Sequence, residues 1–531
     1  MANGYAHSGD AKGTLLGHPK GLFVLFFAEM WERFSYYGMR ALLIFYLVQH
    51  WLYSDSEASV IYGAYTALVY ITPVIGGYLA DRYLGQRKAV LFGAVLLTFG
   101  HFLMAFEGSS GGQSDPAINI FWLALAFIIV GSGFLKANIS VIVGQLYPRT
   151  DARRDGAYTI FYMGINLGAA LGSIIAGYLG QTFGWAYGFG AAGVGMLLGL
   201  LVFIWGRPYL VGRGEPDNLA VLERRTIGIR FEWLLYGAGL LLVGLCWLLV
   251  QNQSLVGGLL GIFGAGLVLY VITTAVTRLN RQDRDRIFAA LFLIFGSILF
   301  WALFEQAGSS LNLFTDRHVD RTVFGIEVPA SVFQSINSIY IVLLAPLFAG
   351  LWTTLGRKGL EPSVTIKFAF ALAQLGLGFL VLVAGAGSDA LTPVLFIFLI
   401  YLLHTTGELC LSPVGLSAMN RLAPAHMASL IMGTWFFASA TGNFAAGLIA
   451  AATGAEGVSD GGTAKQVVLD VYTTVGWVAI AAAVAVALVS PLISRLMHLD
   501  TLRDDHPEDH LAGQREFSEP TAAGVHPAIR D

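Results

Sequence analysis

The sequence predicts an all-α membrane protein with fourteen transmembrane helices, and three observations predict it. Hydrophobic residues make up 56% of the 531 residues and charged residues only 12%, whereas about a quarter of a soluble domain is charged. Apolar segments long enough to cross a bilayer, roughly 20 residues each, recur along the chain with short polar breaks. The basic residues gather in alternate breaks, as expected of loops on one side of a membrane.

The apolar segments end at polar, Gly or Pro residues, which mark loops and turns between helices. In chain order they are 22–49, 58–80, 88–106, 120–144, 156–180, 185–206, 231–250, 255–277, 287–315, 332–355, 363–385, 392–420, 427–453 and 466–495.

Lys and Arg indicate the orientation of these spans. With the N-terminus inside, 25 of the 31 Lys and Arg residues fall in the inner loops and tails. Outer loops hold only Arg317, Arg321 and Lys465. An excess of basic residues marks cytoplasmic loops, and the N-terminus lacks the pattern of a secretory signal. We therefore expect a multi-pass protein of the cytoplasmic (inner) membrane with both termini in the cytoplasm.

Two inner linkers rich in charge bracket the segments 231–250 and 255–277, which consist mainly of Leu, Gly and Val. We interpret those two segments as a hairpin inserted between two bundles of six helices. The predicted divisions are a cytoplasmic tail at 1–20, a six-helix bundle at 21–206, a linker with the inserted hairpin at 207–286, a second six-helix bundle at 287–495 and a cytoplasmic tail at 496–531.

Several classes of protein are disfavoured. The basic residues lie in short loops rather than on one continuous face, which argues against nucleic-acid binding. We find no metal-ligand spacing, nucleophile elbow or phosphate loop, so we expect no metal, no cofactor and no enzyme. No soluble domain is present to support a receptor. Cys246 and Cys410 are isolated within apolar segments and are interpreted as packing residues.

Charges at membrane depth are the functional candidates, and six plus six helices around such charges are typical of a secondary transporter. In the first span, Glu29, Arg33, Tyr36 and Arg40 recur at helical spacing and share one face, while Glu32 lies at its flank within reach of Tyr36. We expect the two carboxylates to neutralise Arg33. The alternative is a purely structural pair that binds neighbouring helices.

Three further spans carry one central charge each. Lys136 lies in GSGFLKANIS, Glu305 in FWALFEQAGSSLNLF and Glu408 in HTTGELCLSPVG. The first half thus contributes cations and the second half anions, so a zwitterion fits between them, held by charge-assisted hydrogen bonds. The simpler alternative is that Lys136 and Glu305 only pair with each other. Both hold if that pair closes a gate and opens for substrate.

Amide and aromatic side chains complete the candidate site. Asn166, Asn337 and Asn443 can satisfy peptide-like donors and acceptors, or can join helices. The aromatic residues that could wall an apolar cavity, or could simply pack in the core, are Tyr36, Tyr37, Tyr70, Trp301, Trp435 and Phe436. His101 and His404 lack acidic neighbours in sequence and are interpreted as core or interface residues.

Two resemblances narrow the prediction. The loop GGYLADRYLGQRK, residues 76–88, resembles the signature of the major facilitator superfamily, which implies a conformational latch at Asp81, Arg82 and Arg87. EMWERFSYYG, residues 29–38, resembles the ExxERFxYYG signature of the proton-dependent oligopeptide transporters. The segments FYMGINLGA, GWAYGF, FWALFEQAGSSLN, GELCLSPVG and MGTWFFASATGN resemble further motifs of that family. Bacterial members have two extra helices between the bundles, which agrees with fourteen spans.

The resemblance implies proton-driven import of di- and tripeptides, and we expect the protein to work as a monomer. Proton coupling would involve Glu29, Glu32, Arg33, Lys136 and Glu305. The peptide carboxylate would be held by Arg33 and Lys136, and the amino end by Asn166, Asn337 and Glu408. Glu305 would pair with Lys136, and Tyr36, Tyr37, Tyr70, Ser412 and Trp435 would line the site.

The sequence departs from the animal members of that family at one position. Those members have a coupling histidine in the second helix, whereas segment 58–80 has none. Coupling should therefore depend on carboxylates. Transport of nitrate or another small metabolite is the remaining alternative.

Overall fold

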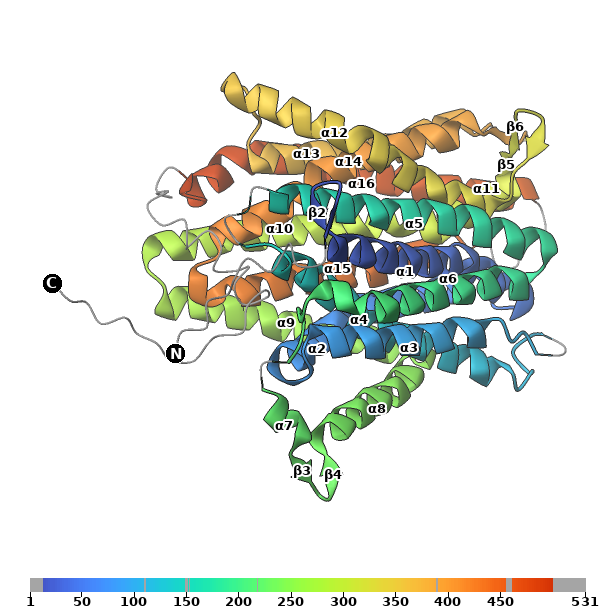
Figure 1. The fold of residues 1–531 in the computed structure, drawn as a ribbon. Coiled ribbons are helices and arrows are strands. Elements are labelled where there is room, and N and C mark those ends of the chain that lie inside the picture. The colour runs from blue at the N-terminus through green and yellow to red at the C-terminus, as the bar shows by residue number, and fades with distance from the viewer. Residues whose placement is uncertain are drawn as a thin grey trace.

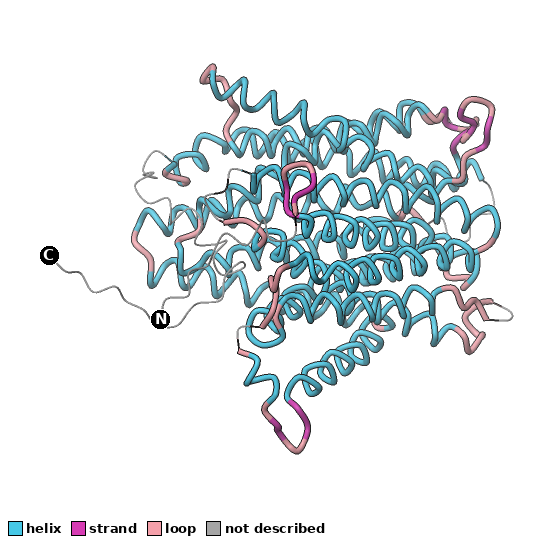
Figure 2. The backbone as a smooth tube through the Cα atoms, in the orientation of Figure 1, coloured by secondary structure: helices cyan, strands magenta, loops and turns pink. Residues whose placement is uncertain are grey.

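The computed structural model describes residues 13–108, 111–148, 151, 153–216, 218–387, 390–454 and 461–499. Most of this chain is helical, as Figure 2 shows. The expected tails at 1–20 and 496–531 lie mostly outside the described residues.

The first bundle has six long helices that run roughly alongside one another (Figure 1). α1 continues into a π-helical turn, η2 (Tyr46–His50), α2 into η3 (Ala80–Leu84) and α6 into the 3₁₀ turn η4 (Arg207–Leu210). The long helices are α1 (Lys20–Phe45), α2 (Asp55–Leu79), α3 (Gln86–Met104), α4 (Ile118–Gln145), α5 (Arg153–Phe183) and α6 (Trp185–Gly206).

The second bundle contains six spans, of which the first is broken. Its helices are α10 (Arg281–Phe304) and α11 (Ser310–His318), joined by the 3₁₀ turn η5 (Glu305–Gly308), then α12 (Ser335–Arg357) after η6 (Ala330–Gln334), α13 (Val364–Gly385), α14 (Leu395–Leu422), α15 (Ala428–Ala451) after η7 (Ala425–Met427), and α16 (Gly461–Leu496).

The inserted pair is α8 (Phe231–Gln251) and α9 (Gln253–Arg278), preceded by the short helix α7 (Leu219–Glu223). α8 packs against α2 and α4 of the first bundle, and α9 contacts α10 and α15 of the second as well as α2. The pair therefore lies beside the junction of the two bundles.

Four two-stranded ribbons lie outside the helices in the described residues. β1 (Thr14–Leu15) pairs with β2 (His18–Pro19), β3 (Arg225–Thr226) with β4 (Ile229–Arg230), and β6 (Thr322–Val323) with β7 (Ile326–Glu327), all antiparallel. β5 (Val319–Asp320) pairs in parallel with β8 (Thr392–Pro393).

The span prediction is confirmed. Twelve helices of the described chain are long and apolar enough to cross a membrane. α1 and α15, with 26 and 24 residues, also have sufficient length, and α1 falls outside the twelve because Glu29, Glu32 and Arg33 lie at its centre. Each bundle has its own hydrophobic core. The described chain thus forms two bundles of six spans with two added helices.

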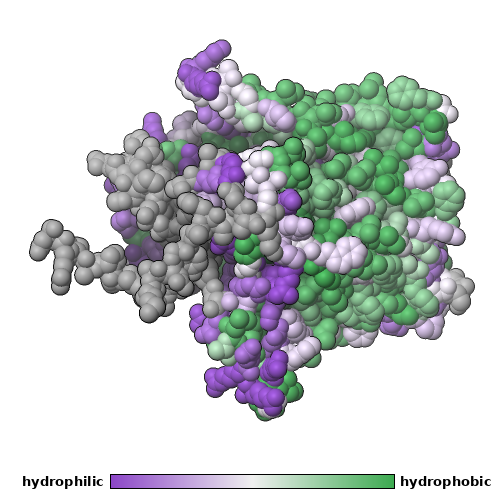
Figure 3. Space-filling view, in the orientation of Figure 1, coloured by the Kyte–Doolittle hydropathy of each residue, from purple (hydrophilic) through white to green (hydrophobic). Residues whose placement is uncertain are grey.

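The two ends of the molecule differ in polarity. Figure 3 shows apolar side chains around the helices and polar ones gathered towards one end. We call it the basic end. It contains the start of α1, the α2–α3 turn, the α6–α8 linker and the α9–α10 turn. Gly21 of α1 packs on Tyr209 of η4, and Arg87 at the start of α3 bonds Gly214 of the α6–α8 linker. Arg286 near the start of α10 bonds His498 after α16.

Candidate functional site

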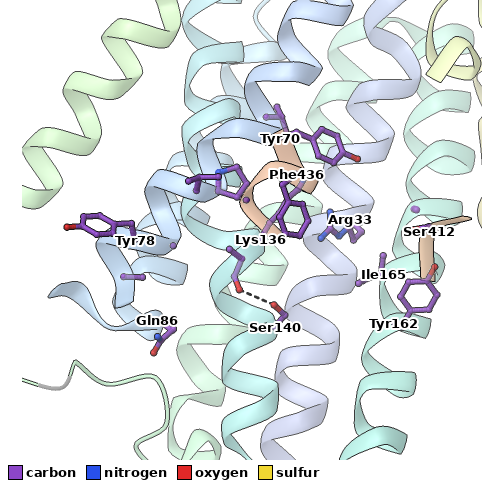
Figure 4. A pocket seen from close by; sticks show the side chains of 18 of the residues that line it. Arg33, Tyr70, Tyr78, Gln86, Lys136, Ser140, Tyr162, Ile165, Ser412 and Phe436 are labelled. Atoms are coloured by element: carbon purple, nitrogen blue, oxygen red, sulfur yellow. Dashed lines mark hydrogen bonds between the residues drawn. The ribbon is translucent and has the colours of Figure 1, made fainter. Parts of the chain in front are cut away.

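A cavity of about 1610 Å³ lies between the bundles. Its lining comes from α1, α2, α4 and α5 on one side and from α10, α12, α14 and α15 on the other. Figure 4 shows Arg33, Tyr70, Lys136 and Phe436 gathered around this space. The lining continues through Asp81 and Gln86 to Glu215 of the α6–α8 linker, so the cavity extends to the basic end.

A ladder of small residues in α5 positions α1. Gly164, Gly168 and Gly172 recur every four residues and face the backbone or ring atoms of Phe26, Met30 and Phe34. A Cβ atom at Gly168 or Gly172 would collide with the carbonyl of Met30 or Phe34. Small residues at this spacing let two membrane helices approach closely. The approach sets the orientation of the charged face of α1.

Arg33 is neutralised within its own helix, as predicted. Its Nε donates to Glu29 Oε1 at 2.7 Å, and Nε lies 3.3 Å from Glu32 Oε2. Both acids are fully buried, whereas the Arg33 side chain is 14% exposed and lines the cavity. Neither Glu32 oxygen accepts a hydrogen bond from a described residue, and the Tyr36 hydroxyl is likewise without a partner in the described chain. Glu32 lies within reach of Tyr36 in sequence, but no hydrogen bond joins the two side chains in the described chain.

The predicted pair of Glu305 with Lys136 is not the one that forms. Glu305 instead pairs with Arg40. Arg40 Nη2 of α1 donates to Glu305 Oε2 of η5, and Arg40 Nε donates to the Tyr62 hydroxyl of α2. The pair is almost completely buried and joins the two bundles. The sequence places Arg40 at membrane depth but does not by itself indicate its partner. The signal was available, since an arginine at membrane depth needs a partner.

The break between α10 and α11 explains the position of Glu305. Gly308 and two serines follow it, and these residue types have low helix propensity. Within the break, Gln306 Nε2 donates to the Ala446 carbonyl of α15 at 3.0 Å, and Ser310 at the start of α11 donates to Gln306 Oε1 at 2.6 Å. Broken helices are a common source of ligand groups in transporters.

Lys136 reaches the cavity from α4 with its charge unmatched. It forms no ion pair within the described chain, and its Nζ lies 3.6 Å from the centroid of the Tyr36 ring. A cation over an aromatic face is stabilised by the ring quadrupole, but much less than by a carboxylate. Lys136 is therefore available to an anionic group.

Glu408 is the corresponding anion in the second bundle. Its Oε2 accepts a hydrogen bond from Asn337 Nδ2 at 3.0 Å, and the same amide donates to Thr405 Oγ1 at 3.0 Å. No basic residue of the described chain forms an ion pair with Glu408. The amide fixes the carboxylate without neutralising it.

The predicted binding residues mostly face this cavity. Tyr36 and Trp435 do not, because both are buried in the cores, at 1% and 3% exposure. Trp301 and Phe436 do line it. The predicted residues in the lining are Arg33, Tyr37, Tyr70, Lys136, Asn166, Glu305, Asn337, Glu408 and Ser412.

The opposite end is sealed by contacts between the bundles. Gly63 of α2 packs on Gly447 of α15, where an added Cβ at Gly63 would lie 2.8 Å from Gly447 Cα. Asn312 Nδ2 donates to the Ala41 carbonyl at 3.1 Å. Arg317 pairs with Asp55 at the surface. The structure is thus open at the basic end and closed at the other.

The predicted latch residues lie at the α2–α3 turn. Asp81 Oδ1 accepts from Gln86 Nε2 at 2.8 Å, and Arg87 pairs with Glu215 at 2.7 Å. Asp81 and Arg82 also line the cavity. Gly85 has φ +73°, and its Cα faces the backbone of Pro216 so closely that a side chain would collide. The turn therefore packs tightly against the linker between the bundles.

A cavity between two helix bundles, with ionisable groups at membrane depth and an opening at one end, defines a membrane transporter of the major facilitator type. The chain belongs to the POT family, whose family model matches residues 87–466.

Curated relatives match along nearly their whole length. The chain is 37% identical to "Peptide transporter YePEPT" of Yersinia enterocolitica over 518 residues, covering 91% of this chain and 96% of the relative. It is 37% identical to "Uncharacterized transporter YclF" of Bacillus subtilis, covering 91% and 95%. It is 32% identical to "Dipeptide and tripeptide permease B" of Salmonella typhimurium, covering 91% and 97%.

Solved structures agree with the fold. A peptide transporter POT in complex with sulfate superposes with a TM-score of 0.78 at 34% identity, covering 91% of this chain and 97% of that one. A POT family transporter in complex with 5-aminolevulinic acid gives 0.77 at 31% identity, covering 91% and 98%.

Proposed function

We propose that this protein is a proton-coupled symporter that imports di- and tripeptides by alternating access. The observation that carries the proposal is the pair of unmatched charges in the cavity, Lys136 on the first bundle and Glu408 on the second. A free peptide has a carboxylate at one end and an ammonium group at the other, so it complements both. The names of two relatives, a peptide transporter and a dipeptide and tripeptide permease, point to the same substrates.

The peptide carboxylate binds Arg33 and Lys136, and the ammonium group binds Glu408 with help from Asn166 and Asn337. Charge-assisted hydrogen bonds at both ends fix the direction of the peptide. Tyr37, Tyr70, Trp301 and Phe436 form the walls for side chains, and Ser412 adds a polar contact.

Protons act on the carboxylates Glu29, Glu32 and Glu305. A proton on Glu305 removes the charge that holds Arg40, which weakens the contact between the bundles at the sealed end. A proton on Glu29 or Glu32 frees Arg33 to bind the peptide carboxylate. When the cavity opens to the cytoplasm, loss of the protons restores both ion pairs, and the return to the outward-facing state completes the cycle.

With the basic end in the cytoplasm, the cavity opens inward, and the protein acts as a monomer in the inner membrane. The excess of Lys and Arg at this end supports the orientation.

The experiment is uptake of labelled dialanine into proteoliposomes, with and without an inwardly directed proton gradient. We expect gradient-driven accumulation for the parent protein and background uptake for Lys136→Ala. Glu305→Gln should lose the gradient dependence while it still exchanges peptide across the membrane. Full gradient-driven uptake by Glu305→Gln would refute its role in coupling.

Competition separates peptides from other solutes. One relative was solved with 5-aminolevulinic acid, which also carries an amino and a carboxyl group. Tripeptides should compete with dialanine strongly, 5-aminolevulinic acid weakly and nitrate not at all. Strong competition by nitrate alone would favour transport of a small anion.

A further inference from the structure

Three of the β-ribbons are two-residue hairpins with the same unusual tip. In each, a large apolar residue followed by glycine occupies the turn, and the apolar residue has a positive φ of 51°, 52° or 51°. These residues are 82%, 85% and 101% exposed. They are Leu16 between β1 and β2, Ile227 between β3 and β4, and Phe324 between β6 and β7.

An apolar residue at such a tip is costly in water. A left-handed backbone conformation suits Gly, Asn or Asp and strains other residues, most of all a β-branched one such as Ile227. Its side chain also remains almost fully exposed. The cost of exposure is removed where the side chain enters lipid instead of water, and the burial gained there offsets the backbone strain.

The β3–β4 hairpin lies at the membrane boundary of the basic end. Strand β4 ends at Arg230, and α8 begins at Phe231 without a linker. Lys88 at the start of α3 pairs with Glu232 at 2.7 Å, which fixes the start of α8 at the level of the α2–α3 turn. Trp233, 63% exposed, follows, and exposed Trp is typical of the membrane interface. Figure 1 shows the hairpin projecting sideways from the bundles.

The hairpin is also strongly basic. Residues 223–230 are all exposed, and they include Arg224, Arg225 and Arg230 against one acid, Glu223. None of the three arginines forms an ion pair within the described chain. The β6–β7 hairpin at the opposite end differs, because its Arg321 pairs with Asp316 at 3.5 Å and with Glu327 at 3.0 Å.

We propose that the β3–β4 hairpin is a docking site for anionic phospholipids, in which Ile227 enters the boundary of the acyl chains and Arg224, Arg225 and Arg230 bind the headgroup phosphates. Charge complementarity selects the lipid, since each basic residue near an anionic membrane surface contributes to binding. The site anchors the start of α8 and so holds the inserted pair beside the bundle junction. It is independent of which solute the protein carries.

The first test measures the depth of a spin label at Ile227→Cys in nanodiscs of phosphatidylcholine with increasing phosphatidylglycerol. Cys246 and Cys410 are buried, so the added cysteine can be labelled selectively. We expect oxygen accessibility to rise and aqueous-reagent accessibility to fall as phosphatidylglycerol increases. With Arg224, Arg225 and Arg230 changed to Gln, the apparent affinity for phosphatidylglycerol should fall about fivefold for each arginine replaced. The same label at Phe324→Cys is the control and should show no phosphatidylglycerol dependence.

A second measurement covers the case in which the label perturbs the turn. Ile227→Asn suits the left-handed conformation better, so its melting temperature in detergent should equal or exceed that of the parent. In phosphatidylglycerol nanodiscs the order should reverse. A label at position 227 that stays exposed to water at every lipid composition, or the same order of stability in detergent and in nanodiscs, would overturn the proposal.

Discussion

The two arginines of α1 are neutralised in different ways. Arg33 is paired within its own helix, to Glu29 and Glu32, whereas Arg40 is paired across the bundle junction to Glu305. Relative motion of the bundles leaves the first arrangement intact and must break the second. The comparison teaches that burial of an ion pair does not define its role. Motion of the bundles alone does not separate the charges of the Arg33 cluster, while the Arg40 pair can exist only when the opposite end is closed.

Arg40→Ala should have the largest effect. Removing one partner of a buried ion pair leaves an uncompensated charge, which costs about 3 to 5 kcal/mol. We expect a clear fall in the melting temperature in detergent and loss of uptake. The double variant Arg40→Ala with Glu305→Gln should recover much of the melting temperature, since the orphaned carboxylate is gone. Equal instability of the single and double variants would mean that the pair does not hold the bundles together.

The fold could be predicted from the sequence because it depends on local properties. Apolar length and loop charge located all fourteen spans, with α1 and α15 also among them despite their polar residues. The partner within one helix, Glu29 for Arg33, followed from spacing alone. The partner of Glu305 could not, because the choice between Arg40 and Lys136 depends on how two bundles meet. Tyr36 and Tyr37 are neighbours of the same residue type at nearly the same depth, so the sequence does not distinguish them. The rotation of α1 about its axis decides that Tyr37 faces the cavity.

Glu408→Gln should have the next largest effect, in this case on peptide binding. It removes the unmatched negative charge of the second bundle. The amide oxygen still accepts from Asn337, but the negative charge is lost. A hydrogen bond to a charged group contributes about 1.5 to 3 kcal/mol, so KM for dialanine should rise about tenfold or more. N-acetyl dialanine, which has no ammonium group, should bind both forms equally. Thr406→Val, on the same helix but outside the cavity lining, is the control and should leave KM unchanged.

Gly63→Ala tests the sealed end without touching a charge. The new Cβ would lie 2.8 Å from Gly447 Cα, and overpacking of this kind costs about 1 to 3 kcal/mol. The closed form of this end should lose population. Spin labels at Leu52 and Ile326, both exposed at that end, should report longer distances. Gly77→Ala is the matched control in the same helix, because its Cβ would meet only Ala137 Cβ at 3.8 Å. Identical distance distributions in the two variants would exclude a role for the glycine contact.

The smallest effect is expected from Asp55→Asn, which breaks the second ion pair across the junction. The side chains of Asp55 and Arg317 are 21% and 41% exposed, against 4% and 9% for Glu305 and Arg40. Exposed pairs contribute about 0 to 1 kcal/mol, so the population of the closed end should change about fivefold at most. Salt at ~1 M shortens the screening length to about 3 Å, and it should cancel the difference between parent and Asp55→Asn in the Leu52 to Ile326 distances. The same salt should leave the Arg40→Ala defect unchanged, because a buried pair is screened much less. If Asp55→Asn instead opened the seal as far as Arg40→Ala, in a manner insensitive to salt, the contrast between surface and buried pairs would fail, and the closed state would depend on the rim of the junction.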